Sequence, residues 1–249
     1  MVWGVLHMWP GSTITKTNAC LMKKGAMKTC KETIILAKQN MVGQVSPALE
    51  KHLSSLKLKF ESYAPISNAS WLLIRDLVEF QTPKKGAILL RKGRISRKTY
   101  FICEGALRAY CSDENGKSYN KNLFLEHDFA GSKVSALQGT PSTFTVEALE
   151  NSILISIDYK KYRELISANQ DLKNFYIAYL ERNWIIEKEQ REVSLVLENA
   201  TVRYRKFIGK HPGIDKRISL QHIASHLGIT PTQLSRIRKD LKSSLNQHM

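Results

Sequence analysis

The chain has 249 residues, 43% of them hydrophobic, which is enough for one large core or for a medium domain beside a smaller one. A formal net charge of +16 favours a polyanionic partner such as nucleic acid. No run of about 18 apolar residues is present, so we expect no contact with a membrane. The four cysteines have neither metal-ligand nor disulfide spacing, so we expect a cytoplasmic protein that holds no metal or cofactor.

The charged and titratable residues do not form a catalytic pattern. The 7 histidines are scattered, without metal-ligand spacing and without a nucleophile motif beside them. A metalloenzyme of the cupin type would need a His-x-His run, which the sequence lacks. We therefore expect no enzymatic activity.

Residues 1–45 are rich in Lys and Thr and show no sustained periodicity. Met41 offers a second start just ahead of the first organised segment. We expect a disordered basic tail or a misassigned start site, with a basic arm that contacts DNA as the alternative.

Residues 46–168 have the pattern of a β-rich domain with flanking helices. Apolar residues at helical spacing predict short helices at 47–60 and 68–80. Short apolar or alternating runs then predict strands at 87–90, 100–103, 106–110, 119–124, 143–148 and 153–157. Asn115 and Gly116 between two of these runs indicate a β-hairpin. The fold class is therefore α+β, with an N-terminal jelly roll that we interpret as an effector domain.

A long helix follows the β-rich domain and a short helix at 159–167. The helical pattern from 170 to about 197 contains no Gly or Pro, and we assign residues 169–199 to a dimerisation helix. A heptad-like seam of apolar side chains predicts contact with a second copy of the chain. The seam consists of Leu172, Tyr176, Tyr179, Ile186, Val193 and Leu197. The alternative is that this stripe packs on its own β-rich domain.

Residues 200–249 carry ten Lys and Arg against two Asp, and within them residues 220–239 fit a helix-turn-helix. The first helix supplies small Ala224 at the helix crossing, Gly228 suits the positive φ of the turn, and Leu234 and Ile237 form the buried face of the second helix. Thr230 is expected to cap that second helix.

With those apolar side chains turned inward, a polar and cationic surface suited to a major groove is left outside. It consists of Thr232, Gln233, Ser235, Arg236, Arg238 and Lys239. We expect Arg236 to contact guanine and Gln233 or Thr232 a neighbouring base, while the others grip phosphate. The alternatives are an ordinary basic helical hairpin, or a ligand-binding or protein-interaction module whose basic C-terminus binds nucleic acid without sequence preference.

The order of these parts resembles the Crp/Fnr family of bacterial transcriptional regulators. The resemblance covers about residues 46–242, and its most specific parts are 220–239 and the strand, glycine turn and strand at 100–110, which read Y-F-I-C-E-G-A-L-R-A-Y. It implies a cyclic-nucleotide-binding-like β-roll, a homodimer formed by the long helix, palindromic double-stranded DNA as the target, and RNA polymerase as a candidate partner. The family's helix-turn-helix is winged, but here we expect the wing to be short or missing.

The effector pocket departs from the family's pattern. Gly131 is kept, but Ser132 stands where the family has the Glu that binds ribose, and Ser142, followed by Thr143, stands where it has the Arg that binds the cyclic phosphate. A phosphate without its guanidinium loses the charge-assisted pair that dominates its recognition. We therefore expect a degenerate pocket that does not bind cAMP in the family's manner, with another effector or none.

Overall fold

A computed structural model describes residues 47–114 and 118–246 of the chain. The expected basic tail at 1–45 and the Asn115 and Gly116 turn lie outside the described residues. From Lys51 onward the chain belongs to one compact unit. The domain boundaries that the sequence suggested remain predictions.

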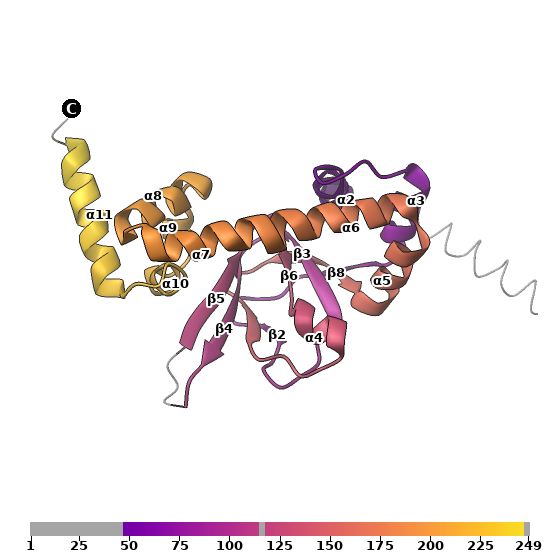
Figure 1. Cartoon of the computed structure of the whole chain (residues 1–249), viewed down its shortest axis with the longest axis horizontal. Coiled ribbons are helices and arrows are strands. Elements are labelled where there is room, and N and C mark those ends of the chain that lie inside the picture. The colour runs from indigo at the N-terminus through magenta and orange to yellow at the C-terminus, as the bar shows by residue number, and fades with distance from the viewer. Residues whose placement is uncertain (1–46, 115–117, 247–249) are drawn as a thin grey trace, which may run out of the picture. The chain divides into compact units, whose positions relative to one another are not determined.

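Two antiparallel four-stranded sheets form the β-rich part (Figure 1), with strand orders β1-β8-β3-β6 and β2-β7-β4-β5. Every strand that the sequence predicted is present, and the hairpin is confirmed as the β4–β5 pair. The expected α+β class is therefore confirmed. The strands are β1 Val78–Gln81, β2 Ile88–Leu90, β3 Lys98–Glu104, β4 Leu107–Ser112, β5 Ser118–Phe124, β6 Phe129–Ala130, β7 Thr145–Ala148 and β8 Ile153–Asp158.

The helix expected at 68–80 was too long, because α3 (Asn68–Arg75) ends earlier and β1 follows it. Val78 and Phe80 lie opposite Ile157 and Ile155 of β8 in an antiparallel ladder. The ladder satisfies the backbone groups of 78–81 as well as a helix would, and apolar residues two apart fit a strand. Pairing with a strand that is distant in sequence decided the structure of this segment. The sequence also did not predict β6 or the short helix α4 (Lys133–Gln138).

Helices α2 (Pro47–Glu61) and α5 (Tyr159–Ala168) flank the β-roll, and an aromatic cluster joins it to the start of the long helix. The rings of Phe60 and Phe175 stack with centroids 4.1 Å apart, and Phe129 and Tyr179 meet edge to face at 5.7 Å. Offset and edge-to-face contacts of this kind stabilise beyond their buried area. The cluster fixes the start of the long helix against the β-roll.

The long helix is present as three consecutive segments: α6 (Gln170–Leu180), the π-helical η2 (Glu181–Ile186) and α7 (Glu187–Leu197). The predicted seam divides along it. Leu172 and Tyr179 are buried within the chain, and half-buried Tyr176 places its hydroxyl 3.4 Å from that of Tyr159. Ile186 and Val193 remain 52% and 48% exposed. The first half of the seam therefore packs on its own β-rich domain, which was the alternative, and only the second half is available to a partner.

Helices α8 (Ala200–Lys210), α9 (Ile214–Arg217), α10 (Leu220–His226) and α11 (Pro231–Asn246) follow the long helix. Their core side chains, among them Tyr204, Ile214 and Leu234, form one buried cluster. Between Ala200 and Asn246 the described chain is helical and contains no strand of a wing. None of the described helices is long and apolar enough to cross a membrane.

Candidate DNA interface and ligand pocket

Helices α10 and α11 form the expected helix-turn-helix. Ala224, Leu234 and Ile237 are buried between the two helices, as their pattern predicted. Gly228 lies in the turn with a φ of 69°, a conformation that side chains with a Cβ rarely adopt. The Thr230 hydroxyl accepts a hydrogen bond from the backbone N–H of Gln233 at 3.1 Å, so the predicted cap of α11 is formed.

The outer face of α11 presents most of the polar residues that the sequence assigned to DNA. Thr232, Gln233, Ser235, Arg236 and Lys239 are all exposed. Because buried Leu234 and Ile237 fix the rotation of α11, these side chains share one solvent-facing surface. A helix with exposed donors and cations along one face can enter a major groove and contact both bases and phosphates.

Arg238 differs from its neighbours on α11. It is half-buried, and its guanidinium donates to the carboxylate of Asp215 at 2.9 Å. This ion pair connects α11 to α9 inside the helical domain. The structure thus gives Arg238 an internal contact, in place of the phosphate contact that the sequence suggested.

Helix α10 lies against β5 through contacts that the sequence analysis missed. Asn120 of β5 is buried, and its backbone N–H donates to the Ser225 hydroxyl at 2.8 Å while its side-chain amide donates to the His222 carbonyl at 3.0 Å. Ala106 and Leu125 of the β-roll belong to the same buried cluster as the core of the helix-turn-helix. In the sequence, Asn120 is a polar residue within the strand expected at 119–124, and its burial became apparent only in the structure.

Two arginines approach the histidines of α10. Arg108, which pairs with Glu147 at 2.7 Å, lies 3.3 Å from Nδ1 of His222, and Arg191 of α7 lies 3.4 Å from Nδ1 of His226. Burial lowers the pKa of His222, with a further contribution from Arg108. Burial, followed by the charge of Arg191, lowers the pKa of His226 to about 3. Neutral imidazoles accept from these guanidinium groups, whereas protonated ones would be repelled by them.

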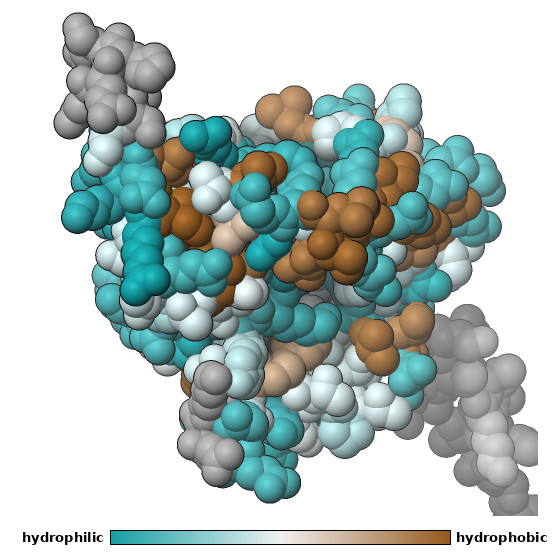
Figure 2. Space-filling model, turned by 60° about the vertical axis from the view of Figure 1, so that its left-hand side comes forward, coloured by the Kyte–Doolittle hydropathy of each residue, from teal (hydrophilic) through white to brown (hydrophobic). Residues whose placement is uncertain are grey.

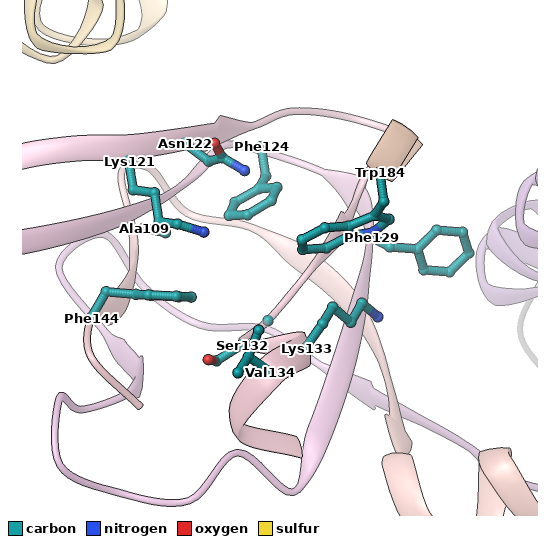
Figure 3. A pocket seen from close by; sticks show the side chains of 11 residues that line it. Ala109, Lys121, Asn122, Phe124, Phe129, Ser132, Lys133, Val134, Phe144 and Trp184 are labelled. Atoms are coloured by element: carbon teal, nitrogen blue, oxygen red, sulfur yellow. The ribbon is translucent and has the colours of Figure 1, made fainter. Parts of the chain in front are cut away.

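A small pocket opens in the β-roll between β4, β5, α4 and η2 (Figure 3). Its walls combine aromatic rings with a few polar groups, and its cavity volume is about 40 Å³. A single water needs about 10–15 Å³ by the same measure, so the pocket as it stands has room for a few waters. The lining includes Lys121, Asn122, Phe129, Phe144 and Trp184.

The structure separates the four residues predicted for the effector pocket. Gly131 and Ser132 line the pocket. Ser142 is buried elsewhere with its hydroxyl donating to the Phe144 carbonyl at 2.8 Å, and Thr143 is exposed. The half of the motif that would meet a cyclic phosphate therefore lies outside the pocket lining.

Lys133, at the start of α4, has its ammonium among the rings of Phe129, Tyr159 and Tyr179, 5.8–6.0 Å from their centroids. It donates to the Thr99 hydroxyl at 2.7 Å. Burial lowers its pKa to about 8. Although Lys133 lines the pocket, its ammonium is turned toward the aromatic cluster, beside Phe129 (Figure 3).

The described residues hold no group of three or more His, Cys, Asp or Glu side chains that could bind a metal ion. Cys103 is buried, and burial raises its pKa to about 12, which leaves it an unreactive thiol.

Comparison with known proteins is consistent with this arrangement. The sequence pattern described as "Cyclic nucleotide-binding domain" matches residues 80–169. The cAMP-activated global transcriptional regulator CRP of Pasteurella multocida is 26% identical over 172 residues, which are 65% of this chain and 80% of that protein. CRP of Escherichia coli O6:H1 is 25% identical over 164 residues, 62% of this chain and 78% of the relative.

Solved structures share the fold. FixK2 from Bradyrhizobium japonicum superposes with a TM-score of 0.57 at 16% identity, covering 67% of this chain and 85% of FixK2. The c-di-GMP responsive global regulator CLP of Xanthomonas campestris superposes with a TM-score of 0.54 at 13% identity, covering 72% of this chain and 93% of CLP. At these identities the likeness concerns the fold alone.

Proposed function

This chain belongs to the Crp/Fnr family of transcriptional regulators, and from that premise we propose that it binds a palindromic DNA site as a homodimer and does not respond to cAMP. Its role is non-catalytic. As a regulator it would act at promoters together with RNA polymerase, in the bacterial cytoplasm.

The observation that carries the proposal is the exposed face of α11. Thr232, Gln233, Ser235, Arg236 and Lys239 face solvent on a helix whose rotation is fixed by buried Leu234 and Ile237. Arg236 is exposed near the start of the helix, where recognition helices contact base edges. A guanidinium in that place can bind O6 and N7 of guanine with two hydrogen bonds.

Selection of random duplexes by the purified protein at moderate salt tests the DNA target. We expect enrichment of one palindromic motif, and Arg236→Ala should weaken binding by about 1–3 kcal/mol and relax the preference at one base pair of each half-site. Arg94→Ala, which removes the same charge from an exposed loop of the β-roll, is the matched control and should retain the motif. Equal affinity for every duplex would instead favour the alternative of a module that binds nucleic acid without sequence preference.

The homodimer is supported by the apolar side chains left exposed on η2 and α7. Ile186, Val193 and Leu197 fall on the heptad stations of the seam and are 52%, 48% and 77% exposed. Groups of apolar side chains are visible on the surface in Figure 2. A helix face of this kind loses unfavourable hydration when a second copy covers it.

The absence of a cAMP response is inferred from the pocket. Ser132 and Ser142 cannot supply the charges of Glu and Arg, and the Ser142 hydroxyl already donates to the Phe144 carbonyl. The cavity of about 40 Å³ is also small for a nucleotide. Titration calorimetry with cAMP should give no saturable heat, and micromolar binding would contradict this part of the proposal.

A further inference from the structure

Two polar side chains of β5 point into the pocket. Figure 3 shows the ammonium of Lys121 and the amide nitrogen of Asn122 both turned toward its interior. The ammonium lies 4.8 Å from the centroid of the Phe144 ring, which lines the same space. Both groups are hydrogen-bond donors. The polar side of the pocket therefore suits an acceptor.

Arg191 of α7 fixes the orientation of Asn122. Its guanidinium donates to the Asn122 side-chain oxygen at 2.6 Å and to the Lys121 backbone carbonyl at 3.0 Å. Because the oxygen of the amide is held by Arg191, its N–H₂ group is left to face the pocket. The donor is thus oriented before a ligand arrives, which lowers the entropic cost of binding.

Within the part of the chain that the structure describes, the cations next to Asn122, Lys121 and Arg191, are not paired with a carboxylate. Partial burial lowers the pKa of Lys121, and the charges of Arg191 and Lys188 lower it further, whereas Cys111 opposes the shift. Lys121 is nevertheless exposed, and cations that repel one another are stabilised by an anion placed near them.

The remaining walls are aromatic and leave little space. Phe124, Phe129, Phe144 and Trp184 surround the polar groups, and Trp184 comes from the π-helical segment η2. π-helical turns frequently occur at functional sites. Flat walls favour a planar ring. The cavity of about 40 Å³ holds only a few waters as it stands, so a single ring needs a wall to move and a nucleotide would need a much larger displacement.

We propose that this pocket binds a small aromatic oxyanion, a single ring that carries a carboxylate or phosphate group, with Lys121 and the Asn122 amide holding the anionic end. The ring lies between the aromatic side chains, and Trp184 adjusts to admit it. The inference deepens the proposed function, since such a ligand would be the effector of the regulator. Its test uses no DNA.

Titration calorimetry on the full chain provides the test, with benzoate and phenyl phosphate as probes for the two anionic groups. We expect saturable binding of at least one of them at one site per chain. Benzamide, a neutral isostere of benzoate, and acetate, an anion without a ring, should bind about tenfold more weakly or worse. Quenching of tryptophan fluorescence by the bound probe should disappear in Trp184→Phe.

Substitutions on β5 and α6 identify the anion contact. Lys121→Met should weaken binding of the aromatic anion by about tenfold or more, because it removes a charge-assisted contact. Lys121→Arg retains the charge and should retain most of the affinity. Lys173→Met, on an exposed part of α6, removes the same charge and should change nothing.

Three outcomes would overturn the inference: no saturable binding of either aromatic anion below about 10 mM, equal binding of benzamide and benzoate, or equal losses in Lys121→Met and Lys173→Met. Circular dichroism of the Lys121 variants separates lost binding from lost folding. If an aromatic anion binds while duplex selection enriches no motif, the pocket assignment stands and the DNA proposal falls. If duplex selection enriches a palindromic motif while neither aromatic anion binds, the DNA proposal stands and the pocket assignment falls.

Discussion

The two halves of the long helix have similar apolar patterns and different surroundings. On α6, Leu172, Phe175 and Tyr179 are buried against the β-roll and its flanking helices. On α7 no side chain is buried, and Val196 and Leu197 are 82% and 77% exposed. The β-roll covers the first half of the helix and leaves the apolar side chains of the second half to solvent.

The difference shows that a heptad-like pattern identifies a face to be buried but not the surface that buries it. On α6 the nearest apolar surface belongs to the same chain, and forming that contact costs no association entropy. On α7 Arg191 contacts Asn122 and Leu195 lies near Gly228 of the helix-turn-helix, whereas Val196 and Leu197 face solvent. Burial of that second face therefore requires another molecule.

The largest loss of stability is expected from a substitution in α6, the half of the long helix that packs on the β-roll. Phe175→Ala removes a fully buried ring that stacks on Phe60 and should lower the free energy of unfolding by about 3–5 kcal/mol. Urea unfolding followed by circular dichroism measures it. Ile177→Ala, on the same helix at a site 54% exposed, is the control and should cost about 0.5 kcal/mol or less. Equal losses would mean that α6 is not packed as described.

A substitution on α7, the exposed half of the long helix, should change self-association of the chain more than its stability. Val193→Glu places a charge on the proposed dimer face, and burying an unpaired carboxylate there should weaken self-association by about tenfold or more. Sedimentation analysis over a range of concentrations measures the dissociation constant. Asn174→Glu adds the same charge on an exposed part of α6 and should leave the dimer intact. A wild-type chain that stays monomeric would remove the dimer from the proposal.

The contact of α7 with α10 should make stability depend on pH. The pKa of His226 is lowered from 6.5 to about 3 in the folded chain, first by burial and then by Arg191, His211 and Lys210. Between these values the unfolded chain binds more protons than the folded one, so stability is complete above pH 6.5 and declines as the pH falls toward 3. Urea unfolding at several pH values between 7.5 and 5 tests this.

His226→Gln keeps an acceptor for Arg191 but does not titrate, so its stability should fall less steeply with acidification. His127→Asn is the control, because His127 is exposed and its φ of 67° suits asparagine. If the wild type and His226→Gln show the same slope, His226 is not buried against Arg191.

The helix-turn-helix was predictable because its determinants are local. Ala224, Gly228, Thr230, Leu234 and Ile237 lie within a short segment, and each has a steric or hydrogen-bonding reason for its position. The strands were predictable for a similar reason, since alternation over a few residues fits a half-buried strand. The strand at 78–81 was not, because its conformation depends on pairing with β8.

The sequence by itself determined which residues form strands and helices in most of the described chain, and which face of α11 is polar, because both follow from side-chain periodicity over one or two turns. Only the tertiary structure decided the rest. It placed Arg238 against Asp215, Asn120 against α10, and the start of the seam inside the chain. These contacts join residues that are distant in sequence, and their geometry depends on how the elements pack.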